Sequence, residues 1–97
     1  MTIYIAGPIT GYPDLNMGAF TDAERILEER GHTVANPHDL CKPGWSWLQC
    51  MRMDISAMMK CDAIYVLRGW EHSKGAVLEH DLALYLGIEI YFEGRLP

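Results

Sequence analysis

Basic residues are scarce in this chain of 97 amino acids, which has eight Lys and Arg against thirteen Asp and Glu and a formal net charge of −5. A nucleic-acid polymer needs a basic stripe on its protein partner, so this balance argues against one but leaves room for a small phosphorylated ligand. No apolar run approaches the roughly 20 residues that span a bilayer, and the first residues lack the basic segment of a secretory signal. We therefore expect a cytoplasmic protein without a membrane partner.

Cysteine is also rare, and the three that are present form no CxxC pair: Cys41, Cys50 and Cys61. An odd number of cysteines without a secretory signal predicts reduced thiols. The four histidines lack the HExxH or CxxC spacing of a metal site. We therefore expect neither a metal nor a cofactor.

Short apolar runs alternate with helical patterns along the whole chain. We expect strands at residues 3–6, 32–35, 63–67 and 88–92, and helices at about 17–30, 45–60 and 74–86. Alternating strands and helices predict a parallel sheet with right-handed crossovers. The expected fold is therefore a single α/β domain over residues 1–97. It is a doubly wound, Rossmann- or flavodoxin-like three-layer sandwich with a parallel sheet of four to five strands.

Two details of the helices follow from the same patterns. Asn16 is expected to cap the first helix at its start. The second helix is expected to bury one apolar stripe, formed by Leu48, Met51, Ile55, Met58 and Met59.

In a sheet of this kind, ligands bind at the carboxyl ends of the strands, near the point where the strand order reverses. The loop that directly follows the first strand consists of Gly7, Pro8, Ile9, Thr10 and Gly11. Its glycines would let the backbone approach a ligand closely. The loop is neither GxGxxG nor a P-loop. A tight strand-to-helix turn is therefore an equally good interpretation.

The segment from Ser73 to Glu79 is more specific. Gly75 and Glu79 share the inner face of the third helix, and a carboxylate on an apolar face is costly unless it has partners. Burial would raise the pKa of Glu79, which suits nucleophilic or acid–base chemistry. Gly75 would leave space for a ligand, and Ser73 would present its hydroxyl and free N–H groups to an anion. A purely internal hydrogen bond of Glu79 is the alternative.

Further candidates lie outside this segment. Trp70 falls in a loop at the same edge, where an aromatic ring could stack on a base or line an apolar pocket. Asp54 lies at the edge of the stripe on the second helix, and alone it would be an ordinary solvated charge. The third helix has a second apolar face, for which we expect another subunit as the cover and hence a homodimer or larger assembly. That face consists of Val77, Leu78, Leu84 and Tyr85.

Together these motifs resemble the nucleoside 2-deoxyribosyltransferase-like superfamily, which includes the deoxynucleoside 5'-monophosphate N-glycosidases. The matching residues are Tyr4 to Gly11, Asp54, Cys61 to Val66, and the spacing Ser73-x-Gly75-x-x-x-Glu79. The chain is most similar to a short branch found in phages and bacteria. The resemblance implies a doubly wound parallel sheet. It also implies cleavage or transfer at the N-glycosidic bond of a (deoxy)nucleoside or its 5'-monophosphate.

The resemblance also implies roles for single residues. Glu79 matches the nucleophile that attacks C1' of the sugar and forms a covalent glycosyl-enzyme. Asp54 matches the carboxyl group that protonates the leaving base or holds the sugar hydroxyls. Tyr4 matches a tyrosine beside the sugar. Chemically this is the arrangement of a retaining glycosidase.

Phosphate recognition follows the family pattern only in part. Ser73 matches a serine that binds the 5'-phosphate in the monophosphate hydrolases. Thr10 stands where those hydrolases carry an arginine, so Lys74 or Arg68 would have to supply the positive charge.

A second class of function remains open, namely a module that binds a nucleotide or an ADP-ribose-like ligand without turnover. An enzyme needs Glu79 and Asp54 within reach of one sugar. A binding module would tolerate their separation and rely on Ser73, the glycine loop and the tryptophans. A purely interacting protein would use the third helix but leaves Glu79 unexplained.

Overall fold

The centre of the computed structural model, which describes residues 1–97, is a parallel sheet of four strands in the order β2-β1-β3-β4. The strands are β1 (Thr2–Ala6), β2 (Thr33–Ala35), β3 (Ala63–Val66) and β4 (Glu89–Phe92). Strands β1 and β3 are buried along almost their whole length, because they lie between two neighbours and are covered on both faces. This burial explains why both read as continuous apolar runs.

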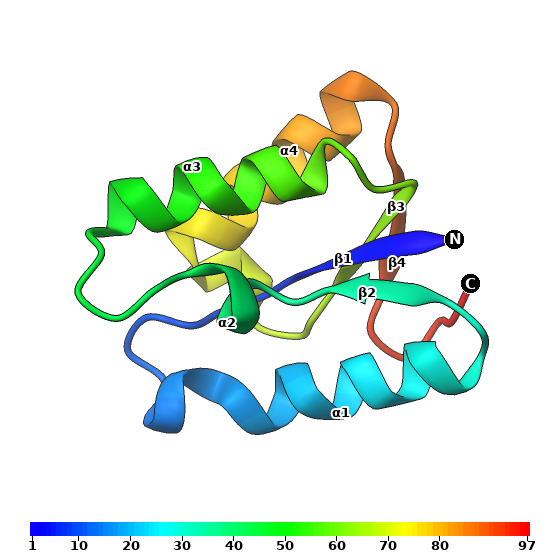
Figure 1. Ribbon diagram of the computed structural model, residues 1–97. Helices are drawn as coiled ribbons and strands as arrows, with labels where there is room; N and C mark the ends of the chain where they lie inside the picture. The colour runs from blue at the N-terminus through cyan, green and yellow to red at the C-terminus, as the bar shows by residue number, and fades with distance from the viewer.

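Helices cover both faces of this sheet, as Figure 1 shows. They are α1 (Met17–Glu29), α2 (Pro37–Leu40), α3 (Trp47–Met58) and α4 (Lys74–Leu86), with 3-10 turns η1 (Pro13–Asn16) and η2 (Trp70–His72). Phe20 and Leu27 of α1 pack on one face of the sheet, whereas Met58 of α3 and Ala83 of α4 pack on the other. The predicted three-layer α/β sandwich is confirmed, with four strands. None of the helices combines the length and the apolar character that crossing a membrane requires.

The strand order reverses between β1 and β3, which places the switch point of the sheet at their carboxyl ends. The segments that follow β1 and β3 approach each other closely there, since the amide of Leu67 donates to the carbonyl oxygen of Ala6 at 2.8 Å. A Cβ atom on Gly7 would lie 2.9 Å from Cβ of Leu67, a distance that such atoms do not reach without a shift of the backbone. Gly7 is therefore required by the packing of the loop after β1 against the end of β3.

Several local expectations are wrong. Asn16 directly precedes α1, but it has a left-handed conformation and makes no cap; its side-chain amide donates instead to the carbonyl oxygen of Pro8 at 2.9 Å. Leu48 and Met59 are exposed rather than part of a buried stripe, because α3 packs on the sheet and α4 through a narrower face. The short helix α2 was not expected; Asn36 caps it by accepting from the amide of His38.

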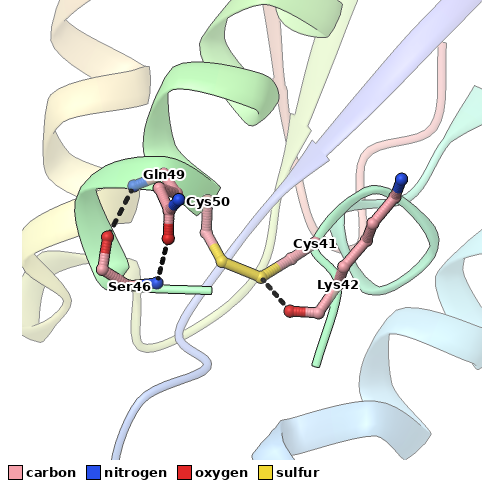
Figure 2. Close-up of a disulfide and its surroundings, with 5 residues drawn as sticks. All are labelled: Cys41, Lys42, Ser46, Gln49 and Cys50. Carbon is pink, nitrogen blue, oxygen red and sulfur yellow. Dashed lines mark hydrogen bonds between the residues drawn. A yellow bond between two sulfur atoms is a disulfide. The ribbon is translucent and has the colours of Figure 1, made fainter. Parts of the chain in front are cut away.

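The expectation of three reduced thiols is also wrong. Cys41, directly after α2, is joined to Cys50 in the first turn of α3 by a disulfide, and Cys61 alone is free (Figure 2). Beside it, Ser46 and Gln49 form a reciprocal capping box that starts α3. An odd number of cysteines means only that at least one of them is unpaired, so it does not exclude a single disulfide. The spacing of nine residues between Cys41 and Cys50 does not predict this disulfide either. The disulfide ties the start of α3 to the end of α2.

The close approach at Gly7 predicts a clear difference between two glycine substitutions. Gly7→Ala should lower the free energy of unfolding by about 1–3 kcal/mol, because the added methyl group overlaps Cβ of Leu67. Gly18→Ala should raise it by up to about 1 kcal/mol, because Gly18 lies in α1 with open space around it. Urea unfolding measures both. Equal effects of the two substitutions would contradict the role assigned to Gly7.

Candidate functional site

The structure brings Tyr4 and Glu79 into direct contact. Tyr4 lies in the middle of β1 and faces the layer formed by α3 and α4, while Glu79 lies on the buried face of α4. The Tyr4 hydroxyl donates a hydrogen bond of 2.5 Å to Oε2 of Glu79. Both residues are almost fully buried, with exposed fractions of 0% and 4%. Glu79 is therefore an interior carboxyl group with a tyrosine as its hydrogen-bond partner.

Asp54 is a second carboxyl group in the same layer. It lies on the buried face of α3 between Met51 and Met58 and is only 5% exposed, so it is not the solvated charge that its position alone suggested. Its Oδ1 atom is buried and has no hydrogen-bond partner. Buried polar atoms nearly always have a hydrogen-bond partner in folded proteins. The unpaired oxygen of Asp54 is therefore available to a hydrogen-bond donor on a ligand.

The electrostatics of the three residues are coupled. Burial raises the pKa of Asp54 to about 7. Burial is also the main cause that raises the pKa of Glu79 to about 8; the hydrogen bond from Tyr4 lowers it, and the charge of Asp54 raises it further. The pKa of Tyr4 lies well above its ordinary value, first because of burial and then because of the charges of Glu79 and Asp54. Two carboxyl groups that titrate near neutrality can divide the roles of nucleophile and acid.

Ser73 and Gly75 lie at the start of α4, as predicted, and both are half-buried. The Ser73 hydroxyl caps the helix by accepting from the amide of Ala76 at 3.3 Å. The face of Gly75 is covered, since a Cβ atom there would lie 3.1 Å from Sδ of Met51 and 3.8 Å from Nε1 of Trp47. The predicted space above Glu79 is thus filled by side chains of α3.

The loop after β1 is only partly near this cluster. Gly7 and Pro8 are buried at the switch point, and Ile9 packs against the core on the α1 side of the sheet. Thr10 and Gly11 are exposed, with Gly11 in a left-handed conformation. Much of this loop is therefore a turn that connects β1 to α1 rather than a lining of the carboxyl pair.

Trp70 lies at the carboxyl edge in η2, but its ring is engaged. It stacks on His80 of α4, with ring centroids 4.2 Å apart. Trp70 also lines a hollow of about 160 Å³ between the ends of β3 and β4, together with Gly69 and Phe92. A second hollow of about 370 Å³ lies on the outer side of α3 beside Trp45 and Arg52. Neither hollow is lined by the carboxyl pair.

The two basic residues that would have to replace the missing arginine also interact with other side chains. Arg68 forms an ion pair with Glu93 at 3.5 Å, and its own amide donates to the same carboxylate. The ammonium group of Lys74 lies 4.4 Å from the centre of the Trp47 ring. The sequence places Met51 beside Asp54, one helical turn earlier, but it does not identify Trp47 as a neighbour of the site.

This arrangement is the fold of the nucleoside 2-deoxyribosyltransferases. A 2-deoxyribosyltransferase from the psychrotolerant bacterium Bacillus psychrosaccharolyticus superposes with a TM-score of 0.77 at 19% identity, covering 95% of this chain and 71% of that one. A 2-desoxiribosyltransferase from Leishmania mexicana superposes with a TM-score of 0.74 at 24% identity, covering 94% of this chain and 62% of that one. This chain therefore spans less than two thirds of the Leishmania protein.

By sequence, the chain belongs to the family described as domain of unknown function DUF4406, whose model matches residues 1–92. None of the curated protein sequences matches it. The resemblance seen in the motifs is thus confirmed at the level of the fold.

The buried carboxyl groups predict an unusual dependence of stability on pH. Since the folded pKa of Glu79 is raised above its ordinary value of 4.5 to about 8, the folded state holds more protons than the unfolded state in that window. The free energy of unfolding should therefore fall as pH rises through it. Glu79→Gln keeps an acceptor for Tyr4 but removes this titration, so at about pH 8 the variant should be more stable than the wild type by more than about 1 kcal/mol.

Urea unfolding at about pH 5 and about pH 8 measures the effect. Glu28→Gln, at an exposed position of α1, is the matched control and should follow the wild type. A Glu79→Gln protein with the same pH slope as the wild type would show that Glu79 is not held protonated by burial.

Proposed function

We propose that this protein cleaves or transfers at the N-glycosidic bond of a (deoxy)nucleoside or nucleoside 5'-monophosphate, through a covalent intermediate on Glu79. The observation that carries the proposal is the buried pair of carboxyl groups, Glu79 held by Tyr4 and Asp54 with an unpaired oxygen. The fold shared with proteins described as 2-deoxyribosyltransferases supports it. Both carboxyl groups project from helices that start at the ligand-binding edge of the sheet.

The proposed reaction has two displacements at C1' of the sugar. Ionised Glu79 attacks C1' while the bond from C1' to the base breaks, and protonated Asp54 gives its proton to the departing base. Water or a second base then attacks C1' and gives its proton to the Asp54 carboxylate, while the bond from C1' to Glu79 breaks. The Tyr4 hydroxyl orients the Glu79 carboxylate and stabilises its charge, in keeping with the direction of its effect on the pKa of Glu79.

The productive state carries one proton on the pair, on Asp54 rather than on Glu79. In the free protein the higher pKa of Glu79, about 8 against about 7 for Asp54, places that proton on Glu79, so substrate binding must move it to Asp54. Because the two carboxyl groups interact, their titration belongs to the pair as a whole. A sugar bound beside Asp54 would supply the hydrogen-bond partner that its Oδ1 atom lacks. A substrate therefore completes the polar network of this interior.

Turnover should depend steeply on Glu79 and less steeply on Asp54. Glu79→Gln keeps the shape but removes the attacking charge, so release of free base should fall by several orders of magnitude while ligand binding survives. Asp54→Asn should slow release less for substrates with good leaving bases, because those need less protonation. Chromatography of free base, after incubation with a panel of deoxynucleosides and their 5'-monophosphates, measures both.

Glu28→Gln serves as the control, since its carboxyl group is exposed on α1 and remote from the pair. Wild-type turnover in Glu79→Gln would exclude the covalent route. If no member of the panel is cleaved but nucleotides bind, the protein is a non-catalytic nucleotide-binding or ADP-ribose-like ligand-binding module instead. The panel also decides whether a 5'-phosphate at Ser73 is required.

We further propose that the protein is a homodimer or larger assembly that buries the outer face of α4. Leu84 and Tyr85 on this face are 61% and 83% exposed, and Leu78 beside them is exposed as well. Large apolar side chains that are exposed on one helix face, here around Asp81, are typical of a protein interface. A second copy of the chain, presenting the same face, would cover them.

A charge introduced at Leu84 should therefore disrupt the assembly. Leu84→Asp should convert a wild-type dimer to a monomer, because a carboxylate would be buried in the interface without a partner. Thr21→Asp adds the same charge to the exposed side of α1 and should leave the assembly unchanged. Sedimentation velocity gives the masses. A wild-type protein that sediments as a monomer would exclude this interface.

A further inference from the structure

The contact between α3 and α4 is built in layers, one helical turn apart. The layer nearest the start of the helices contains Met51 and Gly75, and the next contains Asp54 and Glu79. Both helices follow the carboxyl ends of strands, so their first turns lie at the ligand-binding edge of the sheet (Figure 1). The layer of Met51 and Gly75 therefore lies between that edge and the carboxyl pair.

This outer layer is tightly filled. A Cβ atom on Gly75 would lie 3.1 Å from Sδ and 3.6 Å from Cε of Met51, so the thioether occupies the space that the glycine leaves. Met51 is itself only 7% exposed. The indole of Trp47, one turn earlier on α3, lies beside it, and Lys74 lies over the indole ring. A thioether and an aromatic ring thus close the way from the edge to the carboxyl groups.

While this layer is in place, the C1' atom of a sugar cannot come into contact with the Glu79 carboxyl group. Tyr4, Asp54 and Glu79 are all at least nine-tenths buried, and they line neither of the two hollows described above. Of the surrounding groups, the Met51 side chain is the easiest to move. It is unbranched with several rotatable bonds, and Gly75 has no side chain to hold it.

We propose that Met51 is a movable plug that controls access to the carboxyl pair, and that the base of the incoming nucleoside displaces it. The inference rests on the function proposed above. The base then occupies the space that the Met51 side chain has vacated, between Gly75 and Trp47, and stacks on the Trp47 ring. Every ligand must then bear the cost of moving Met51, which lowers its apparent affinity by the fraction of molecules in the open state.

The test compares two methionines of the same helix. Met51→Ala removes the plug, whereas Met53→Ala removes an exposed side chain two residues further on and is the matched control. Titration of the Asp54 and Glu79 carboxyl groups by carbon NMR reports whether water reaches them. In Met51→Ala both titration midpoints should fall toward ordinary carboxyl values, and in Met53→Ala they should stay at their raised positions.

Binding gives an independent readout that needs no turnover. In proteins that also carry Glu79→Gln, calorimetry with deoxyadenosine and thymidine should give at least about threefold tighter binding for Met51→Ala than for Met53→Ala. Met51→Leu keeps the volume but is stiffer and guards against a variant that fails to fold. It should keep the raised midpoints and bind both nucleosides at least about threefold more weakly than wild-type Met51 does in the same background.

The outcomes separate the two proposals. Midpoints in Met51→Ala that match those in Met53→Ala would overturn the role of Met51 alone. Midpoints that fall while neither nucleoside binds any variant would overturn the proposed function, and with it the place assigned to the base.

Discussion

The burial of two carboxyl groups against one strand is the constraint around which this structure is organised. An interior carboxylate is costly unless it is paired or protonated. Here the only hydrogen-bond partner for the pair is the hydroxyl of Tyr4, which donates to Glu79, while an oxygen of Asp54 has none. The helices that carry the two groups must therefore pack closely enough to exclude water, and Gly75 permits that contact. Stability is given up where the two carboxyl groups are buried.

Much of the fold was predictable from local pattern. The four strands and three long helices follow from apolar runs and helical periods that are consistent along the chain. Glu79 was also predictable, because a glycine and a glutamate four residues apart on an apolar helix face are informative without any knowledge of neighbours. Asp54 was ambiguous, since its burial results from the packing of α4 on α3, and one helix alone does not contain that information.

The failures have the same origin. Leu48 and Met59 match the helical period of α3, yet they are exposed because the width of a buried stripe depends on what packs against it. The space expected beside Gly75 is occupied, because a missing side chain admits a neighbouring protein atom as readily as a ligand. The disulfide between Cys41 and Cys50 joins two short segments whose approach depends on the path of the intervening loop.

The position of β1 in the sheet has a consequence for how the site comes into being. Of the four strands this one is made first, yet it lies between β2 and β3 and cannot complete its pairing until both have been made. Tyr4 in this strand can form its hydrogen bond only after Glu79, 75 residues further along the chain, has been made. Contacts between residues so distant in sequence form late and slowly. A nascent chain that stops short of α4 therefore has most of its sheet but no carboxyl pair, and the chemistry proposed for that pair requires the complete α4.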